Sequence, residues 1–429
     1  MTATVVKHPL SSPKPPKDIA AELFAALAQA TGDGVGITRE CYAEGEDRAL
    51  AIYRDTALAH GLHADLDVAQ NLIVSLPDDD GRQPALYLGS HIDSVPQGGN
   101  YDGAAGVVAG LLCLIRMKNA GARPLQPVRL IALRGEESAF YGRANIGSRA
   151  LFGLLDDKDL AARCRGTGRT LSEALATAGL PVDRIARRER LFDARQALGY
   201  LELHIEQGPV MTARNLATAV VTGIRGNVRH RRVTCRGEAG HSGTIPRWLR
   251  HDAVFALSDL VMRLDEHWQR LLERGLDLVI TCGVVGTDPA EHAMSRIPGE
   301  IDFSFEVRSQ SHDTLEAFYE VVLTECKAVS AQRGVRFEFD NRVYTEPARM
   351  DEGLVRRLTE AATRIGQPAE LLPSGAGHDA AVFANAGVPS GMIFVRNANG
   401  SHNPAEAMDL GDFMLGVDLL HAAATSTPT

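Results

Sequence analysis

The segment 89–103 places one imidazole and two carboxylates close together, at the end of an apolar stretch of chain. These side chains are His91, Asp93 and Asp102. His91 and Asp93 are two residues apart, so in an extended chain they point to the same face. Glycines in the loop before Asp102 allow a tight bend and a close approach to an ion. Because ligands of open α/β sheets bind at the carboxyl ends of the strands, this segment predicts a metal site.

The same residue types recur at other places in the chain: Glu136 with Glu137, His204, His241 and His402. The glutamate pair and His204 each come at or after an apolar stretch that predicts a buried parallel strand. Because the carboxyl ends of parallel strands meet at one edge of a sheet, we expect these side chains to lie near His91. The other two histidines stand in glycine-rich segments, 237–243 and 400–403.

Together these side chains predict a centre for two divalent metal ions. Histidine and carboxylate ligands suit zinc, and also manganese or cobalt, better than copper or an iron–sulfur cluster. A carboxylate between the other ligands fits two ions that share one bridge, and such a pair lowers the pKa of a clamped water toward about 7. One residue of the Glu136–Glu137 pair would bind metal while the other takes the water's proton. Adjacent side chains in an extended segment point to opposite faces, so a turn at Gly135 is needed to direct both glutamates to the metal site.

Each cluster also has a structural interpretation when it is taken alone. A histidine at a strand end is usually exposed or structural, adjacent glutamates usually lie on the surface, and Asp102-Gly103 is an ordinary turn signal. Only the joint occurrence of the clusters favours chemistry. The chain has no Gly-x-Ser-x-Gly elbow, so a serine hydrolase finds no support.

Composition limits the class of protein and its compartment. The chain has 429 residues, 45% hydrophobic and 23% charged, which predicts a soluble enzyme of about two domains. A net charge of −9 argues against a nucleic-acid partner. The six cysteines are scattered without a CxxC pair, which favours reduced thiols and a cytoplasmic location. No apolar run suggests a membrane span, and the proline-containing segment 9–16 predicts a flexible leader rather than a signal peptide.

The pattern of elements predicts an α/β fold, with a mainly parallel central sheet and helices on both faces. Helices are expected at 18–30, 46–60 and 103–119, and strands at 69–76, 85–89, 127–133 and 198–205. Residues 143–195 look helical and more polar.

A second domain is expected to interrupt the first. From about residue 222, strands at 231–236, 278–285, 300–307 and 335–344 alternate with helices near 250–274 and 313–333. Four strands and two helices in that order predict an inserted α+β sandwich. After Pro347 the pattern returns to helix, strand and helix. The predicted domains are therefore 1–221 with 346–429, which hold the metal, and 222–345, the insert.

Seven motifs in this order resemble those of a known group of enzymes. They read HID, YDGAAGVVAGL, RGEES, HIEQGPV, GEAGHSGTIP, SGAGHDA and SHNPAE. This order is typical of the amidase/hydantoinase–carbamoylase branch of the dinuclear zinc aminoacylase-like metallopeptidases. The branch includes N-carbamoyl-L-amino acid amidohydrolases, β-ureidopropionases and allantoate amidohydrolases. The resemblance covers about residues 18–415, and it implies a homodimer in which the insert serves as lid and dimerisation domain.

The resemblance implies five metal ligands: His91 and His204 on one ion, Glu137 and His402 on the other, and Asp102 between them. It implies that Glu136 is the general base and that Asp93 fixes the tautomer and orientation of His91. It also implies that His241 of the insert stabilises the developing oxyanion, often across a dimer interface. The alternative for His241 is that it caps a loop in that interface.

The implied substrate contacts are fewer and depart from the branch. Gln207 and His378 match positions that face the carbamoyl or amide end, and Arg308 matches an arginine that pairs with a substrate carboxylate. Arg308 could instead be a structural ion-pair partner. Asn227 stands where the branch usually has Gln, and Ser295 stands where it usually has Asn. The metal positions match while the substrate positions differ, so an unusual substrate, anionic or aromatic, is compatible with the sequence.

The resemblance therefore predicts a metal-dependent hydrolase of a linear amide or carbamoyl C–N bond in a small carboxylate-bearing molecule. Domain closure would bring His241 and Arg308 to the substrate. One alternative is an aminohydrolase that deaminates an unusual, for example aromatic, amino-carboxylate with the same metals. Another is a non-catalytic binding protein on the same fold. The products separate the first two, because a carbamoylase releases ammonia and carbon dioxide whereas a deaminase releases ammonia alone.

Overall fold

The computed structural model describes residues 14–121, 124–368 and 370–426, and it divides the chain into two compact units. The first unit contains the described residues up to 220 together with 351–371 and 378–426. The second unit contains 221–350 and 372–377. Most of the predicted N-terminal leader lies outside the described residues. The assignment of 222–345 as a lid and dimerisation domain stays a prediction.

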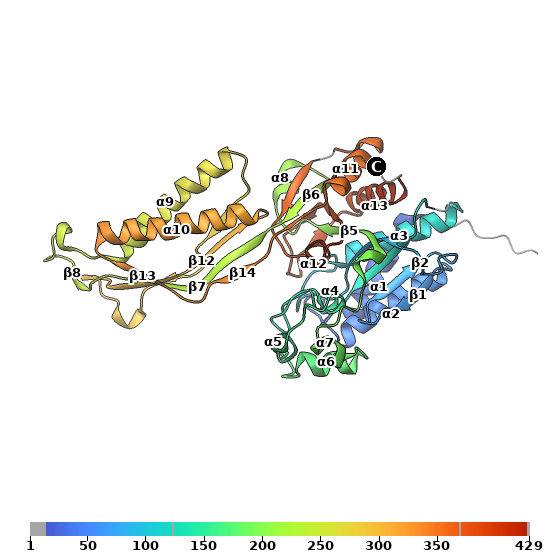
Figure 1. The fold of residues 1–429 in the computed structure, drawn as a ribbon, viewed down its shortest axis with the longest axis horizontal. Coiled ribbons are helices and arrows are strands. Elements are labelled where there is room, and N and C mark those ends of the chain that lie inside the picture. Colours follow the sequence, from blue (N-terminus) through green and yellow to red (C-terminus); the bar gives the residue numbers. More distant parts are fainter. Residues whose placement is uncertain (1–13, 122–123, 369, 427–429) are drawn as a thin grey trace, which may run out of the picture. The chain divides into compact units, whose positions relative to one another are not determined.

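A mixed sheet forms the centre of the first unit (Figure 1). Its strands follow the order β1-β2-β4-β3-β5-β17-β6-β15, and the four strands β4, β3, β5 and β17 run parallel. β1 and β2 are antiparallel and complete one edge. β6 carries the chain onward into the second unit, where β15 and β16 pair with it. The strand bounds are β1 His63–Leu66, β2 Leu72–Ser75, β3 Ala85–His91, β4 Val128–Leu133, β5 Ala197–Ile205, β6 Thr218–Ile224, β15 Ala348–Arg349, β16 Leu371–Ser374 and β17 Ser390–Val395.

Helices flank this sheet, as the alternating pattern predicted. They are α1 Pro16–Thr31, α2 Glu44–Ala59, α3 Ala104–Ala120, α8 Val210–Arg214, α11 Glu352–Arg364, α12 Asp379–Asn385 and α13 Leu410–Thr425. The segment expected to be helical over 143–195 contains only short helices, α4 Ile146–Leu151, α5 Asp157–Leu160, α6 Leu171–Thr177 and α7 Val182–Ala186. Two of these begin at capping boxes, on Asp156 and Thr170. Capping boxes start a helix locally, which suits short helices in a polar segment.

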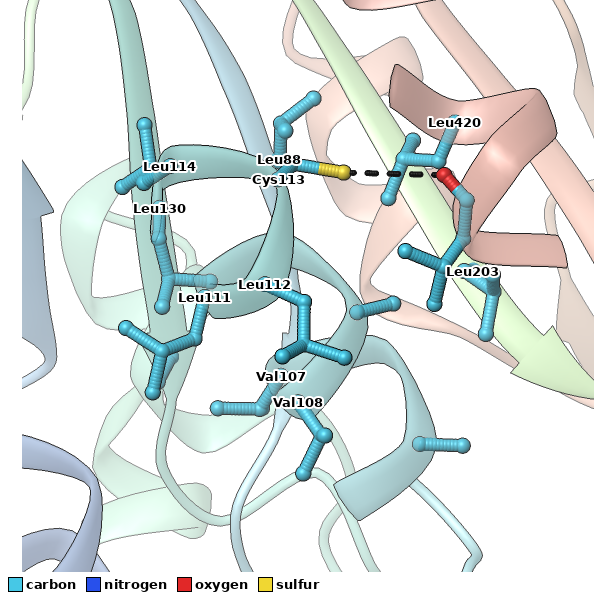
Figure 2. Close-up of a cluster of buried hydrophobic side chains, with 14 of the residues drawn as sticks. Leu88, Val107, Val108, Leu111, Leu112, Cys113, Leu114, Leu130, Leu203 and Leu420 are labelled. Atoms are coloured by element: carbon cyan, nitrogen blue, oxygen red, sulfur yellow. Dashed lines mark hydrogen bonds between the residues drawn. The ribbon is translucent and has the colours of Figure 1, made fainter. Parts of the chain in front are cut away.

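The core of the first unit packs around α3, whose residues from Ala104 to Ile115 are all apolar or small. Its leucine and valine side chains contact β3, β4 and β5 on one side and α13 on the other (Figure 2). The Cys113 thiol lies 3.8 Å from the Val417 carbonyl oxygen of α13. At Gly106 a Cβ atom would lie 2.1 Å from the Leu203 carbonyl oxygen, so only glycine lets α3 approach β5 this closely.

The second unit packs two long helices on one face of an antiparallel sheet (Figure 1). The helices are α9 Ala253–Glu273 and α10 His312–Arg333. Burial alternates along the central strand β12, because only one of its faces meets the helices. The strands of this unit from β7 to β14 are β7 Gly226–Arg236, β8 Gly240–His241, β9 Val279–Thr281, β10 Val285–Gly286, β11 Arg296–Ile297, β12 Glu300–Ser309, β13 Arg336–Phe339 and β14 Val343–Thr345.

The strands predicted from the sequence differ from those of the structure in length and in number. The strand expected at 231–236 begins at Gly226, and each of the strands expected at 278–285 and 335–344 is divided in two. Asp340 lies between the two parts of the latter strand; its backbone N–H donates to the Arg232 carbonyl oxygen, and its Oδ1 lies 3.1 Å from His230 Nδ1. A small two-stranded sheet of β18 Asn397–Ala398 and β19 Ala407–Met408 precedes α13. Among the described residues, no helix is long and apolar enough to cross a membrane.

Candidate metal centre

The five predicted metal ligands lie together in the first unit. Adjacent parallel strands β4, β3 and β5 end at the same edge of the sheet. His91 is the last residue of β3, Glu137 follows the end of β4, and His204 stands near the end of β5. Asp102 comes just before α3, and His402 comes from the loop between β18 and β19. All are buried except His402.

Asp102 stands between two groups of possible metal donors. Its Oδ1 lies 3.4 Å from His91 Nε2 and 3.1 Å from His204 Nε2. Its Oδ2 lies 3.3 Å from His402 Nε2, which is in turn 3.0 Å from Glu137 Oε1. When two ligand atoms each lie about 2.1 Å from the same tetrahedral zinc ion, the distance between the two ligand atoms is about 3.4 Å. The distances between donors in both groups therefore suit a pair of ions that share Asp102.

Backbone carbonyls fix which nitrogen of two imidazoles can bind a metal. His91 Nδ1 lies 3.1 Å from the Asp93 carbonyl oxygen, and His204 Nδ1 lies 2.9 Å from the Ile205 carbonyl oxygen. A carbonyl oxygen only accepts, so each Nδ1 must carry hydrogen, and each neutral ring then presents the lone pair of Nε2. The two Nε2 atoms lie 3.3 Å apart, beside the buried and unpartnered Asp102 Oδ1. Such a convergence of lone pairs fits a cation.

Asp93 holds the turn that carries the two glutamates. Its Oδ1 accepts from the Glu136 N–H and its Oδ2 from the Glu137 N–H, each at 2.9 Å. The backbone carbonyl oxygen of Asp93 is closer to His91 Nδ1, at 3.1 Å, than its carboxylate Oδ1 is, at 3.4 Å. The carbonyl is therefore the main contact of Asp93 with His91. Gly135 has φ +67°, which favours glycine, and this turn allows both glutamates to face the cluster.

Glu136 is buried next to Glu137, and no cationic side chain of the described residues lies at ion-pair distance from it. Burial, the largest cause, raises the pKa of Glu136 well above its ordinary value; a charged His91 opposes this, and Glu137 adds to it. A carboxyl group with a raised pKa is a better proton acceptor than an ordinary glutamate, as a general base requires. Asn145 Nδ2 donates to Glu136 Oε1 at 3.2 Å and to Asp379 Oδ1 at 3.0 Å.

Two predicted substrate contacts lie in the same cluster. Gln207 has φ +62°, and its Nε2 donates to Asp102 Oδ2 at 2.8 Å, so the amide is already engaged with the central carboxylate. His378 is buried, with its ring edge-on to that of His204 at 4.4 Å between centroids. Burial, followed by the charge of His204, lowers the pKa of His378 well below its ordinary value. His378 is therefore neutral at physiological pH.

Two more predicted contacts, Asn227 and Arg308, are paired in the sheet of the second unit. They stand opposite one another on β7 and β12. Arg308 Nη1 donates to the Gly375 carbonyl oxygen at 2.8 Å, and Nε lies 3.1 Å from Glu306 Oε2. Asn227 is 5% exposed, and its Oδ1 has no hydrogen-bond partner in the part of the chain that the structure describes.

His241 and Ser295 lie at the opposite end of the second unit. His241 is in β8, next to Ser295, whose carbonyl oxygen accepts from Ser242 N–H at 2.8 Å. Asn227 is paired with Thr345 of β14, and β8 and β14 lie at opposite ends of this unit (Figure 1). The span of β7 between them is on the order of 30 Å at ~3.3 Å per residue. One chain therefore cannot bring both His241 and Arg308 to one small substrate, so their joint action, which stays a prediction, needs His241 from a second chain.

Sequence reasoning gave no role to three polar residues around the cluster: Asn145, Ser401 and Glu406. Ser401 and Glu406 stand inside the SHNPAE motif, so the motif itself was the available signal. Asn145 has no comparable signal, because its contacts depend on a left-handed backbone conformation with φ +56°.

A mixed α/β fold that gathers imidazoles and carboxylates at the ends of its parallel strands defines a metallopeptidase-like hydrolase. Residues 87–426 match the family model of peptidase family M20/M25/M40, and the chain belongs to this family.

Named relatives agree with this class. The chain is 32% identical to an allantoate amidohydrolase of Escherichia coli, over 90% of this chain and 91% of the relative. It is 31% identical to an N-carbamoyl-L-amino acid amidohydrolase of Geobacillus stearothermophilus, over 90% and 92%. A hydantoinase/carbamoylase family amidase of Burkholderia ambifaria superposes with a TM-score of 0.80 at 28% identity, over 95% and 98%. The predicted resemblance is confirmed, and the chain is an amidohydrolase.

Proposed function

We propose that this enzyme hydrolyses a linear carbamoyl or ureido C–N bond in a small carboxylate-bearing molecule. The observation that carries the proposal is the donor cluster around Asp102, with Glu136 beside it as a buried base. The substrate class is supported by the relatives named allantoate amidohydrolase and N-carbamoyl-L-amino acid amidohydrolase. Of these, an N-carbamoyl-amino acid is the substrate we favour.

In this proposal the cluster holds two divalent ions, zinc or else manganese or cobalt. His91 and His204 would hold one ion and Glu137 and His402 the other, with Asp102 as the ligand common to both. When bound, the ions supply Lewis acidity and lower the pKa of the attacking water. Asp93 keeps the ligand-bearing turns in place. The six cysteines are free, which supports a reducing compartment such as the cytoplasm.

The side chains of the enzyme then move the protons and orient the substrate. Glu136 takes a proton from the attacking water and passes it to the leaving nitrogen, so no net proton is consumed at this residue. Gln207 and His378 face the carbamoyl or amide end. Arg308 pairs with the substrate carboxylate, where its planar fork suits bidentate bonding, and Asn227 shapes the substrate site beside it. Ser295 lies next to His241 and would shape the site together with that histidine.

Metal analysis and product analysis together test this function. The purified enzyme is expected to hold divalent metal and to release ammonia and carbon dioxide from an N-carbamoyl-amino acid, allantoate or ureidopropionate. Release of ammonia alone, from an aromatic amino-carboxylate, would support the deaminase instead. Metal without turnover on any of these compounds would support a binding protein.

We further propose that the enzyme is a homodimer in which the partner subunit's His241 completes the site. The separation of His241 from Arg308 along β7 supports this arrangement, because one chain cannot present both to one small molecule. Exposed apolar side chains of the second unit support a protein interface there. Trp248 is 80% exposed, Phe255 57% and Met262 61%. His241 Nδ1 accepts from the Gly243 N–H at 3.1 Å, so the neutral ring carries its hydrogen on Nε2, as an oxyanion donor requires.

Mixing two inactive variants tests whether His241 acts across the interface. His241→Ala and Glu136→Gln are each expected to be nearly inactive alone. After random exchange of subunits at equal amounts, half of the dimers are mixed and have one intact site, which restores roughly one quarter of wild-type activity. If His241 acts within its own chain, the mixture stays inactive. Light scattering on the same samples reports the mass, and a mass of one chain would exclude the dimer.

A further inference from the structure

Glu406 connects two loops that bear predicted metal ligands. It is buried, and it follows His402 in the C-terminal loop. Its Oε1 accepts from the backbone N–H of Tyr101 at 2.9 Å and from that of Asp102 at 3.2 Å. The carboxylate thus holds the backbone of the Asp102 loop from a position about 300 residues later in the chain.

Ser401 provides a second connection between the same loops. Its Oγ lies 2.7 Å from Glu406 Oε2 and 2.5 Å from Asp102 Oδ2. A hydroxyl group has one hydrogen to donate, so Ser401 lies between two carboxylates that compete for it. The next residue, His402, has φ +60°, an unfavourable backbone conformation for histidine. Such a conformation persists only where the surrounding contacts fix it.

The loop around Gly99 leaves room for the Glu406 side chain. A Cβ atom on Gly99 would lie 2.1 Å from Glu406 Oε1 and 2.4 Å from Glu406 Cβ. The φ of Gly99 is not in the left-handed region, so alanine would meet no backbone obstacle of that kind. An alanine at this position would therefore displace Glu406 without changing Glu406 itself.

We propose that Glu406 is a positioning residue that sets the spacing between Asp102 and His402, and so the retention of the ion that these two residues share. The inference rests on the metal centre of the proposed function. Glu406 is not in any of the clusters of possible metal donors among the described residues; it acts through the backbone of Asp102 and through the Ser401 hydroxyl. Partners of ligands typically change metal affinity by about 10–100-fold when they are removed.

The test is the rate at which the zinc-loaded full-length enzyme loses zinc to a chromophoric chelator. Glu406→Ala and Gly99→Ala are both expected to release zinc about 10–100-fold faster than wild type, with one ion lost before the other. Glu406→Gln keeps a side-chain acceptor for the two N–H groups and should restore most of the retention. Glu360→Ala removes an exposed acid from α11 and serves as the control, with release at the wild-type rate.

The outcomes separate this inference from the proposed function. If the Glu406→Ala and Gly99→Ala variants fold and release zinc at the wild-type rate, the positioning role of Glu406 is overturned. If neither variant folds, Glu406→Gln decides, because a few-fold faster release is expected and a wild-type rate would overturn the inference. A wild-type enzyme that retains zinc but hydrolyses no carbamoyl compound would overturn the proposed function alone. A wild-type enzyme that binds no divalent ion would overturn both.

Discussion

Replacing Glu136 by Gln is expected to lower kcat by roughly 10²–10⁴-fold while the enzyme keeps its metal. The amide has nearly the shape of the carboxylate, and it can still accept the hydrogen bond from Asn145 at Oε1. It cannot take a proton from water. Its neighbours Asp93 and Glu137 keep their contacts, so the donor cluster is preserved. Metal content by mass spectrometry and kcat on an N-carbamoyl-amino acid provide the two measurements.

The adjacent glutamate is the matched control for this substitution. Glu137→Gln removes a predicted ligand instead of a predicted base, so it should lose metal as well as activity. Substantial turnover by Glu136→Gln would exclude Glu136 as the base. If both variants lost metal equally, Glu136 would belong with the ligands, since its carboxylate also lies within reach of His91 and Glu137.

Replacing Asp102 by Ala is expected to remove both ions together and to lower activity by roughly 10⁴-fold or more, because the Lewis acid and the activated water each supply several kcal/mol. Asp102 lies between His91 and His204 on one side and His402 on the other. Without its carboxylate, neither group of donors keeps enough ligands. Metal content per chain and residual activity in the presence of excess zinc measure the loss.

Gln207→Ala is a suitable comparison, because Gln207 contacts the same Asp102 carboxylate without being a predicted ligand. It should keep at least one ion. An Asp102→Ala enzyme that retains two ions per chain would show that the carboxylate is not the bridge. Treating wild type with a chelator should reproduce the inactive state, and adding zinc should reverse it.

The parts of the fold that the sequence predicted well are those with strong local signals. β3 and β4 are buried over their full lengths, so their apolar runs identify them as central strands. β1 is four residues long, and only one of its residues is buried, so no apolar run marks it. The parallel direction of the central strands also explains why the sequence alone could place His91, Glu137 and His204 at one edge.

The rest depends on contacts that local patterns do not encode. The distance between His241 and Arg308 follows from the register of β7 with β12 and β14, which the sequence does not reveal. Glu406 meets Tyr101 across 305 residues of chain. Asn145 reaches Glu136 through a turn in the left-handed conformation, which its amino-acid type permits but does not require.

The close approach of α3 to β5 at Gly106 has a consequence for how this enzyme can change. α3 begins two residues after Asp102, so the packing of the helix also sets the place of the central carboxylate. A core mutation that repacks α3 is therefore expected to move the Asp102 carboxylate and to change the geometry of the metal centre. If Asn227, Ser295 and Arg308 of the other unit contact the substrate as proposed, substitutions there would alter selectivity without moving α3. New activities in such a protein are therefore expected to arise at a distance from the buried helix α3.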